Sequence, residues 1–275
     1  MTIKLIALDL DGTTLNNNRV ISAANRQALE AAVDKGVNVV IATGRTFSAL
    51  PPDVFEIRGI QYVLTSNGAV ITDLRTKQVV YENCIAPDAV EAAVDLLKQY
   101  DFMIETFTDG NAYIEKSHYD HIKETRLSFR HVDYVLTTRQ PVAGLYDFIL
   151  EHKEHIENIN VNFENQEDRA MMREVLSKLP KTTLTTSFDH NLEIGGATTS
   201  KAGALKELGK VLGVAPEEMM AVGDSPNDMA MMQIAGMPVA VGNAKEEVKA
   251  IAKYVTATNH EDGVAQAVQK FVLDQ

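Results

Sequence analysis

Two carboxylates follow the first apolar stretch of the chain, and their spacing could support metal-dependent chemistry. Asp9 and Asp11 come directly after residues 5–8, and Gly12 follows them. In an extended chain, side chains two residues apart point to the same side, so both acids could share one metal ion. Gly12 permits a sharp turn whose backbone N–H groups could bind an anion. The plainer alternative is that the acids only end a strand, as Asp and Gly do in many loops.

A second acid-bearing loop and a lysine extend this set. Another short apolar run, residues 219–222, is followed by GDSPND, which contains Asp224 and Asp228. Lys201 stands at the start of a predicted helix that continues to Leu212. Carboxylates are hard oxygen ligands that suit Mg²⁺, and a lysine offsets the charge of a phosphoryl group. These residue types together predict a site that handles phosphate, although a lone lysine could also be merely solvated.

The elements that position these residues alternate as in a parallel sheet. Apolar runs at 37–42 and 61–65 follow the first one, and Ser22 can cap a helix that stops at Gly36. A strand, a helix and a strand in this order build parallel sheets with right-handed crossovers, whose ligands bind at the carboxyl ends of the strands. The run at 37–42 ends in Thr43-Gly44-Arg45, so a hydroxyl and a glycine should lie near the acids, and the run at 61–65 is followed by a polar loop that contains Asn67.

The pattern changes between Ala86 and about His190. Pro87 begins a predicted helix, and Asp109-Gly110 marks a hairpin between two apolar strands. In residues 159–164 apolar and polar side chains alternate, so one face of that strand is polar. We expect an antiparallel sheet with helices on one side and its other face open. This segment is predicted to be an inserted α+β domain whose polar face could act as a lid over the acids.

Length and charge limit the classes of protein to consider. A chain of 275 residues favours two domains, or one core with a large insertion. The formal net charge of −12 opposes binding to nucleic acid or to an anionic membrane, since both need clustered Lys and Arg. No secretory signal or membrane-spanning stretch is apparent, and the single cysteine, Cys84, fits a reducing compartment. We expect a cytoplasmic monomer or homodimer.

The motifs occur in an order that is specific to one family. DLDGTT at Asp9, ATGR with Thr43, Lys201 and GDSPND at Asp224 resemble the four motifs of the haloacid dehalogenase-like phosphatases, and among them the Cof-type sugar phosphatases. SNGA at Ser66, LEI, VAVGNA and NHEDGVA extend the resemblance to both core segments, whereas the middle of the chain resembles the family only in size and pattern.

The resemblance implies an α/β fold in which a Rossmann-like doubly wound parallel sheet carries an inserted α+β cap. The expected boundaries are residues 1–84 for the first core segment, 85–190 for the cap and 191–275 for the second core segment. The cap is implied to select the substrate. The sequence departs from the usual family pattern at Thr14, Ala202 and Gly195-Gly196, and none of these changes removes a catalytic group.

The resemblance also implies a role for each motif residue. Asp9 would be the nucleophile that forms an aspartyl-phosphate, while Asp11 would protonate the leaving oxygen and later activate water. Mg²⁺ would be held by the Asp9 carboxylate, the Asp11 backbone carbonyl and Asp224. The groups implied to contact phosphate are the Leu10 N–H, Thr43, Gly44, Lys201 and Asn227. The residues implied to support them are Arg45, Asn67 and Asp228, the last by orienting Lys201 or metal-bound water.

We therefore expect a Mg²⁺-dependent phosphatase of small phosphorylated metabolites, above all sugar phosphates. A phosphomutase or phosphotransferase would use the same aspartyl-phosphate but keep water away from it, and the sequence leaves this alternative open. A regulator that only binds a phosphorylated ligand is the alternative from another class. Retention of Asp9, Asp11, Lys201 and Asp224 argues against it, because binding alone requires neither a nucleophile nor an acid.

Overall fold

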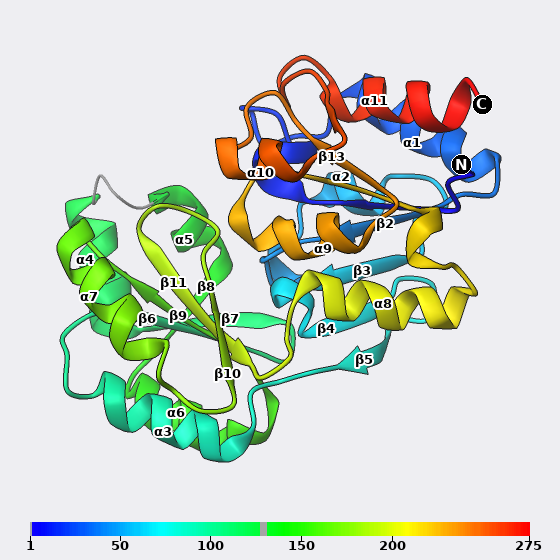
Figure 1. The fold of residues 1–275 in the computed structure, drawn as a ribbon. Helices are drawn as coiled ribbons and strands as arrows, with labels where there is room; N and C mark the ends of the chain where they lie inside the picture. Colours follow the sequence, from blue (N-terminus) through cyan, green and yellow to red (C-terminus); the bar gives the residue numbers. More distant parts are fainter. Residues whose placement is uncertain (1, 127–130) are drawn as a thin grey trace. The chain divides into compact units, whose positions relative to one another are not determined.

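The chain forms two units in a computed structural model, which describes residues 2–126 and 131–275 (Figure 1). Unit 1 consists of Met1–Gly44, Leu50–Glu82 and Ser200–Gln275, and unit 2 of Arg45–Ala49 and Asn83–Thr199. Most of unit 2 therefore lies between two segments of unit 1 in the sequence. That residues 85–190 select the substrate stays a prediction.

Unit 1 is built on an eight-stranded sheet. Neighbouring strands are parallel throughout, except for the antiparallel pairs β3–β4 and β4–β5 at one edge. This confirms the predicted parallel core, to which β4 and β5 add an antiparallel hairpin at one edge. From edge to edge the strands are β14 (Tyr254–Val255), β13 (Met237–Ala240), β12 (Met219–Gly223), β1 (Leu5–Leu8), β2 (Asn38–Ala42), β3 (Tyr62–Thr65), β4 (Val70–Asp73) and β5 (Gln78–Glu82).

Helices cover both faces of this sheet, as the predicted doubly wound fold requires. Helix α1 packs with α11 on one face, and α8 packs with α9 on the other (Figure 1). The side chain of Ser22 accepts a hydrogen bond from the Asn25 N–H, so the predicted cap of α1 is present. The helices are α1 (Ala23–Asp34), α2 (Pro52–Phe55), α8 (Lys201–Leu212), α9 (Met229–Ile234), α10 (Glu246–Ile251) and α11 (Gly263–Val268).

The order of strands reverses direction beside β1, and this places the two acid-bearing loops together. Chain order runs from β1 to β2 on one side, while β12 from the end of the chain pairs with β1 on the other. All four β1 side chains are fully buried, since helices cover both faces. Asp9 follows β1 and Asp224 follows β12, so both lie at the carboxyl edge, where open α/β sheets bind ligands.

Unit 2 contains a six-stranded sheet that is antiparallel except for the β7–β8 pair. The hairpin predicted at Asp109-Gly110 joins β6 to β7, and the helix predicted at Pro87 is α3. From edge to edge the strands are β10 (Thr182–Thr185), β11 (Asn191–Gly196), β9 (Ile156–Asn162), β6 (Met103–Thr108), β7 (Asn111–Glu115) and β8 (Arg139–Val142). The helices are α3 (Pro87–Leu97), α4 (Lys116–Thr125), α5 (Val132–Thr138), α6 (Leu145–Glu151) and α7 (Gln166–Leu176).

The two faces of this sheet differ in chemistry. Ile159 and Val161 of β9 point into an apolar core with helices α3, α6 and α7. Asn160 and the other alternate residues of β9 point to the opposite face, as predicted. The expectation that this polar face is open is wrong: Asn160 is only 3% exposed, and residues of α4 and α5 pack on Ile114 of β7 on the same face. Burial is tolerated there because the polar side chains bond to one another.

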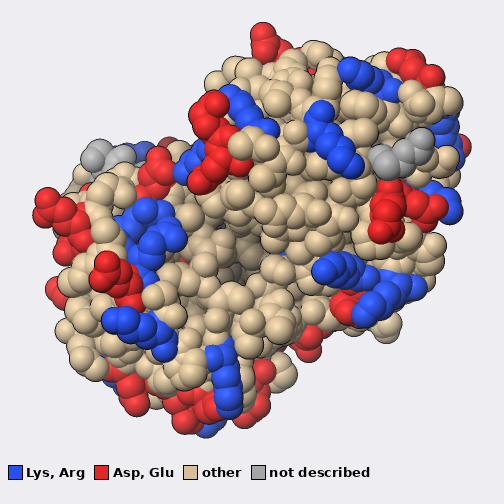
Figure 2. Space-filling model, viewed as in Figure 1, with Lys and Arg blue, Asp and Glu red and all other residues tan. Residues whose placement is uncertain are grey.

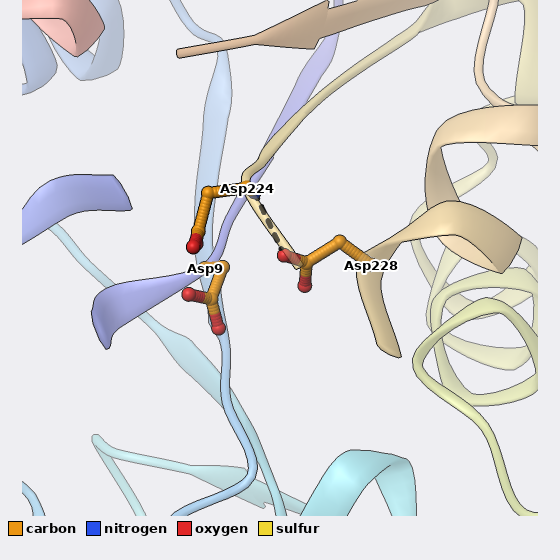
Figure 3. Close-up of side chains that lie close together, drawn as sticks. All are labelled: Asp9, Asp224 and Asp228. Atoms are coloured by element: carbon orange, nitrogen blue, oxygen red, sulfur yellow. Dashed lines mark hydrogen bonds between the residues drawn. The ribbon is translucent and has the colours of Figure 1, made fainter. Parts of the chain in front are cut away.

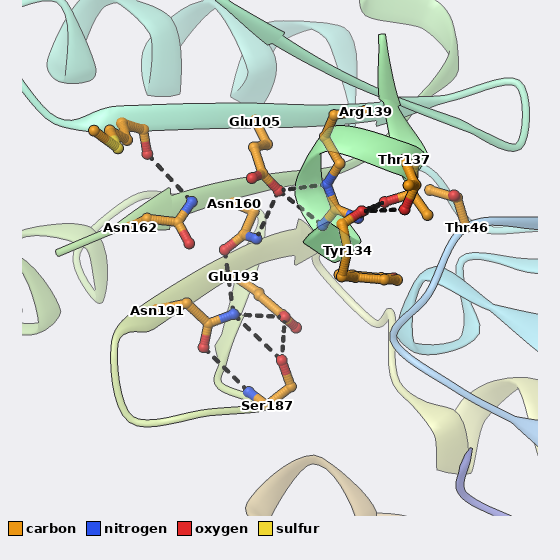
Figure 4. Close-up of polar contacts among 12 residues, drawn as sticks. Thr46, Glu105, Tyr134, Thr137, Arg139, Asn160, Asn162, Ser187, Asn191 and Glu193 are labelled. Atoms are coloured by element: carbon orange, nitrogen blue, oxygen red, sulfur yellow. Dashed lines mark hydrogen bonds and ion pairs between the residues drawn. The ribbon is translucent and has the colours of Figure 1, made fainter. Parts of the chain in front are cut away.

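A hydrogen-bonded network crosses this polar face (Figure 4). The Arg139 guanidinium donates to the Glu105 carboxylate at 2.9 and 3.0 Å, and Asn160 donates to the same oxygen at 3.3 Å. Asn191 continues the chain by donating to the Asn160 Oδ1 at 3.2 Å. The ring of Tyr134 lies under the Arg139 guanidinium, 4.8 Å away at its centroid, which adds a cation–π contact. The network therefore neutralises its buried cation within unit 2.

The surface and the helices carry two further observations. On the face drawn in Figure 2, basic and acidic side chains are interspersed within each unit. The expectation that nucleic acid is not a partner stays a prediction. No helix in the described ranges is long and apolar enough to cross a membrane.

Candidate active site

Asp9 is fixed by a turn that only glycine allows. Its backbone N–H donates to the Val222 carbonyl of β12, and its carbonyl accepts from the Thr14 hydroxyl at 2.5 Å. Gly12 has a φ of +81°, and a Cβ at this position would come within 2.7 Å of a carboxylate oxygen of Asp224. A side chain at residue 12 would therefore be strained by its backbone and would also displace Asp224.

Lys201 lies between two of the acids. It is the first residue of α8, which Ser200 caps by accepting a hydrogen bond from the Gly203 N–H. The Lys201 Nζ donates to the Asp9 Oδ1 at 2.6 Å and to the Asp228 Oδ1 at 2.7 Å. Its side chain is fully buried, so these charge-assisted bonds replace its hydration.

The loop after β12 orients its own two acids. The Asp228 Oδ2 accepts the backbone N–H groups of Asp224 and Ser225, each at 3.0 Å. Asp224 accepts hydroxyl hydrogen bonds from Thr13 at 2.7 Å and from Ser225 at 2.8 Å. Each carboxylate is thus held by neighbours that donate to it, which fixes the directions of its oxygens.

Asp9, Asp224 and Asp228 converge from separate elements (Figure 3). One carboxylate oxygen from each lies within 4.8 Å of the others. Three Asp and one Lys leave a formal charge of −3 + 1 = −2 in a buried place. Hard carboxylate oxygens with an excess of negative charge suit a divalent cation such as Mg²⁺. The donor set therefore fits the predicted metal by its chemistry.

The crowding of these acids shows in their pKa values. Burial, followed by the charge of Asp228, raises the pKa of Asp9 well above its ordinary value, although Lys201 opposes this. Burial and then Asp228 raise the pKa of Asp224 to about 6. Burial lowers the pKa of Lys201, but the charges of Asp228 and Asp9 outweigh burial and raise it, so the lysine stays protonated. The site lacks positive charge, which a cation would supply.

Leu10, Asp11 and Arg45 are three further residues with predicted roles, and they follow β1 and β2. The carboxylate of Asp11 is exposed and is not one of the three that converge. Leu10 is fully buried beside Asp9. The Arg45 guanidinium donates to the Ala49 carbonyl at 3.0 Å and lies 4.8 Å from the centroid of the Tyr134 ring, and both partners belong to unit 2. The predicted roles of these residues stay predictions.

Thr43, Gly44, Asn67 and Asn227 are brought together at the ends of β2, β3 and β12. The Asn67 N–H donates to the Thr43 carbonyl at 3.0 Å. A Cβ on Gly44 would lie 3.2 Å from the Asn67 Oδ1, so the Thr43-Gly44 loop packs closely against the Asn67 side-chain amide. The Asn227 amide donates to the Asn67 Oδ1 at 3.0 Å. Four residues predicted to bind or support phosphate therefore form one group.

The sequence reasoning missed three side chains of this site. Thr13 and Ser225 donate to Asp224, and Asn243 donates to the Gly12 carbonyl at 2.7 Å. Thr13 and Ser225 lie inside motifs that were singled out for their acids, and their hydroxyls were the available signal. Asn243 ends the polar loop after β13, another carboxyl end of a parallel strand, so the topology rule could have found it.

Comparison with known proteins agrees with this architecture. The chain is 34% identical to the 5-amino-6-(5-phospho-D-ribitylamino)uracil phosphatase YcsE of Bacillus subtilis, over 98% of this chain and 96% of the relative. A haloacid dehalogenase-like hydrolase from B. subtilis superposes with a TM-score of 0.83 at 31% identity, covering 97% of this chain and 99% of the other.

A HAD subclass IIB sugar phosphatase superposes with a TM-score of 0.81 at 26% identity, covering 98% of each chain. The family model of the haloacid dehalogenase-like hydrolases matches residues 6–268. The alternation of elements, the four ordered motifs and this match lead to one conclusion: the chain belongs to the haloacid dehalogenase-like hydrolases.

Proposed function

We propose that this protein is a Mg²⁺-dependent phosphatase that hydrolyses phosphate monoesters of small metabolites, in particular sugar and sugar-alcohol phosphates. Asp9 is the nucleophile, and Asp11 is the general acid and base. Lys201, Thr43, Gly44, Asn227 and the Leu10 N–H bind the phosphoryl group. Its action on phosphorylated metabolites as a cytoplasmic monomer or homodimer is part of the proposal.

The observation that carries the proposal is the fully buried Lys201 between Asp9 and Asp228. A protonated lysine 2.6 Å from a carboxylate keeps that carboxylate near a positive charge and can also donate to a phosphoryl oxygen. A phosphate monoester repels an attacking carboxylate, so a cation at the nucleophile is what the reaction requires. A structural ion pair would need only one acid, whereas this lysine lies among three.

In the first step, a carboxylate oxygen of Asp9 forms a bond to phosphorus as the bond from phosphorus to the ester oxygen breaks. The electron pair of that bond leaves with the ester oxygen, which takes a proton from the Asp11 carboxyl and departs as an alcohol. The exposed position of Asp11 supports this role, because its carboxyl can exchange protons with solvent.

In the second step, Asp11 is ionised and accepts a proton from a water molecule. The water oxygen bonds to phosphorus, and the bond to the Asp9 oxygen breaks, which releases inorganic phosphate and restores both acids. Lys201 stays charged through both steps, since the negative charges beside it raise its pKa.

Asp9 and Asp224, together with the backbone carbonyl of Asp11, would hold Mg²⁺. When bound, the ion supplies positive charge that reduces repulsion between Asp9 and the phosphoryl group. Asp228 bonds to Lys201 and to two backbone N–H groups, so we assign it to positioning rather than to the first set of metal ligands.

We further propose that residues 85–190 select the substrate. The support is that most of unit 2 is inserted between two segments of the core that carries the acids. The B. subtilis relative YcsE is named for a phosphorylated ribitylamino compound, whose ribityl chain carries several hydroxyl groups. A test panel should therefore contain that compound beside aldose and ketose phosphates.

The test is release of inorganic phosphate from such a panel with Mg²⁺ and with EDTA. We expect release from at least one sugar or sugar-alcohol phosphate, its loss in EDTA and its return with added Mg²⁺. A phosphomutase would convert the sugar phosphate to an isomer without releasing phosphate. A regulator would bind the ester unchanged, and full activity in EDTA would contradict the metal requirement.

The two acids can be separated by substitution. Asp9→Asn removes the nucleophile while keeping nearly the same shape, so no aspartyl-phosphate forms from any substrate. Asp11→Asn should still accept phosphate from an aryl or acyl phosphate, whose leaving group needs little protonation, and should then accumulate phosphorylated Asp9. Acid quenching and peptide mass spectrometry identify the labelled residue. A label on another residue, or normal turnover by Asp9→Asn, would overturn the mechanism.

A further inference from the structure

A strained turn follows β3 in unit 1. Ser66, Asn67 and Gly68 have φ angles of +49°, +56° and +92°, so three successive residues adopt left-handed conformations. Asn is one of the few residues with a side chain that enters this region readily, and Ser enters it less often. Ser66 and Asn67 are also buried, at 0% and 5% exposure. Strain of this kind persists only where the surroundings hold it, and it is concentrated at functional sites.

The turn contacts the loop that follows β2. The backbone N–H of Asn67 donates to the Thr43 carbonyl at 3.0 Å. The Asn67 side-chain oxygen lies 3.2 Å from where a Cβ of Gly44 would be, so any larger residue at position 44 would push the amide away. The position of the Thr43-Gly44 loop is thus set by both the backbone and the side chain of Asn67.

The same side chain reaches the loop that follows β12. The Asn67 Oδ1 accepts a hydrogen bond from the Asn227 Nδ2 at 3.0 Å. The Asn227 Oδ1 is buried and has no hydrogen-bond partner among the described residues, so the bond to Asn67 orients this amide. Asn227 directly precedes Asp228, which binds Lys201.

The third residue of the turn contacts the start of α8. A Cβ on Gly68 would lie 2.4 Å from the carbonyl oxygen of Ser200 and 3.0 Å from the Cβ of Ala204. Ser200 is the cap of α8, and Lys201 is its first residue. The glycine therefore lets the helix that carries Lys201 approach the turn directly, and a side chain there would separate them.

We propose that the Ser66–Gly68 turn positions three elements relative to one another: the Thr43-Gly44 loop, the loop that carries Asn227 and the start of α8. Within the turn, Asn67 is a positioning residue that acts through Asn227. The inference rests on the proposed function, since it gives the Thr43-Gly44 loop, Lys201 and Asn227 a common ligand, the phosphoryl group. The Asn67 Oδ1 accepts one N–H of the Asn227 amide, so the second N–H of that amide can donate to phosphate.

The test is the substitution Asn67→Gly, which keeps a left-handed backbone without strain and removes only the side chain. The probe is inorganic phosphate, as a competitive inhibitor in the presence of Mg²⁺. We expect its inhibition constant and the substrate KM to rise about three- to tenfold, the loss of one hydrogen bond, while kcat changes less. Lys77→Gly is the matched control, because Lys77 has a φ of +58° at an exposed turn and should leave all three constants unchanged.

A double-mutant cycle separates positioning from general destabilisation. If Asn67 acts through Asn227, Asn67→Gly should weaken phosphate binding no further in an Asn227→Ala background. Full additivity, or an unchanged inhibition constant in Asn67→Gly, overturns the inference. Wild-type protein that neither binds phosphate nor releases it from any ester overturns the proposed function as well, whereas wild-type activity with an indifferent Asn67→Gly overturns the inference alone.

A second variant keeps the test decisive should Asn67→Gly fold poorly. Asn67→Asp retains an acceptor for the Asn227 amide and also tolerates the left-handed backbone, but it adds a negative charge beside the phosphate-binding loops. The added charge should raise the inhibition constant of phosphate at low ionic strength, and at high ionic strength the constant should return close to that of wild type, because the acceptor for Asn227 is kept. An inhibition constant that stays raised at high ionic strength overturns the inference.

Discussion

Each unit buries a cation against carboxylates, and the two clusters differ in charge balance. In unit 2 the Arg139 guanidinium forms an ion pair with Glu105. Burial lowers the pKa of Arg139, but the charge of Glu105 helps to outweigh burial, so the pKa is raised. In unit 1 Lys201 faces Asp9 and Asp228, with Asp224 close by. The unit 1 cluster therefore has an excess of buried negative charge, whereas the Arg139–Glu105 pair has none.

The difference shows how a functional cluster can be told from a structural one. A balanced pair satisfies its own charges and needs no ligand, so it serves the fold. An unbalanced cluster raises the pKa values of its acids, as in Asp9 and Asp224, and this destabilises the protein unless a cation binds. Substitutions of the same kind in both clusters should therefore have different effects.

The largest expected effect is on catalysis, from Lys201→Met. Removal of the buried cation leaves Asp9 beside two other acids and takes a donor from the phosphoryl group. We expect kcat/KM for an aryl phosphate to fall by about 10²–10³-fold or more. Steady-state phosphate release with saturating Mg²⁺ measures it. A loss of less than about tenfold would mean that Lys201 does not act on the transition state.

The matching change in unit 2, Arg139→Met, should affect folding instead. It leaves Glu105 buried without its cation, so the free energy of unfolding should fall by about 3–5 kcal/mol in urea denaturation. Turnover of an aryl phosphate per folded molecule should not change. The double variant Glu105→Leu/Arg139→Met removes both charges and should regain much of the stability, and failure to regain it would contradict the charge explanation.

The effect of Mg²⁺ on stability should depend on pH. The pKa of Asp224 is about 6 in the folded protein and 3.8 is its ordinary value, so the folded state binds more protons between these pH values. The metal-free protein should therefore lose stability as pH rises from about 4 to about 6, with the full loss above about 6. Mg²⁺ competes with these protons, so it should stabilise the protein more at about pH 7.5 than at about pH 5.

The size of that effect follows from mass action. At about one hundred times its dissociation constant, Mg²⁺ should add about 2.7 kcal/mol at the higher pH. Thermal unfolding with and without Mg²⁺ at both pH values measures it. The Arg139→Met variant is the control, because its altered charge lies in the other cluster and should leave the Mg²⁺-induced shift in place. Equal stabilisation at both pH values would show that Mg²⁺ does not compete with protonation of Asp224.

The smallest effect compares two hydroxyl hydrogen bonds of the same length. Thr13 donates to Asp224 at 2.7 Å in unit 1, and Ser187 donates to Glu193 at 2.7 Å in unit 2. The Thr13 hydroxyl lowers the pKa of Asp224, so Thr13→Val should raise that pKa and weaken Mg²⁺ binding about three- to tenfold near pH 6. Ser187→Ala should leave Mg²⁺ binding unchanged. Calorimetric titration with Mg²⁺ compares the variants directly.

Local chemistry in the sequence determined the elements and the identity of the acids. The Ser22 cap, the Asp109-Gly110 hairpin and the helix start at Lys201 depend on residues a few positions apart, and all three are present in the structure. The fold class followed from the same patterns, because apolar runs that alternate with helices leave few arrangements other than a parallel sheet.

Only the tertiary structure decided how residues distant in sequence meet. Lys201 and Asp9 are 192 positions apart and Asn67 and Asn227 are 160 apart, and no spacing in the sequence specifies either contact. The pairing of β12 with β1 brings their loops together, and packing then decides which side chains are desolvated. The buried polar face of unit 2 shows the same limit. Alternation along β9 predicted polar side chains on one face, whereas their burial depended on hydrogen-bond partners from β6, β8 and β11.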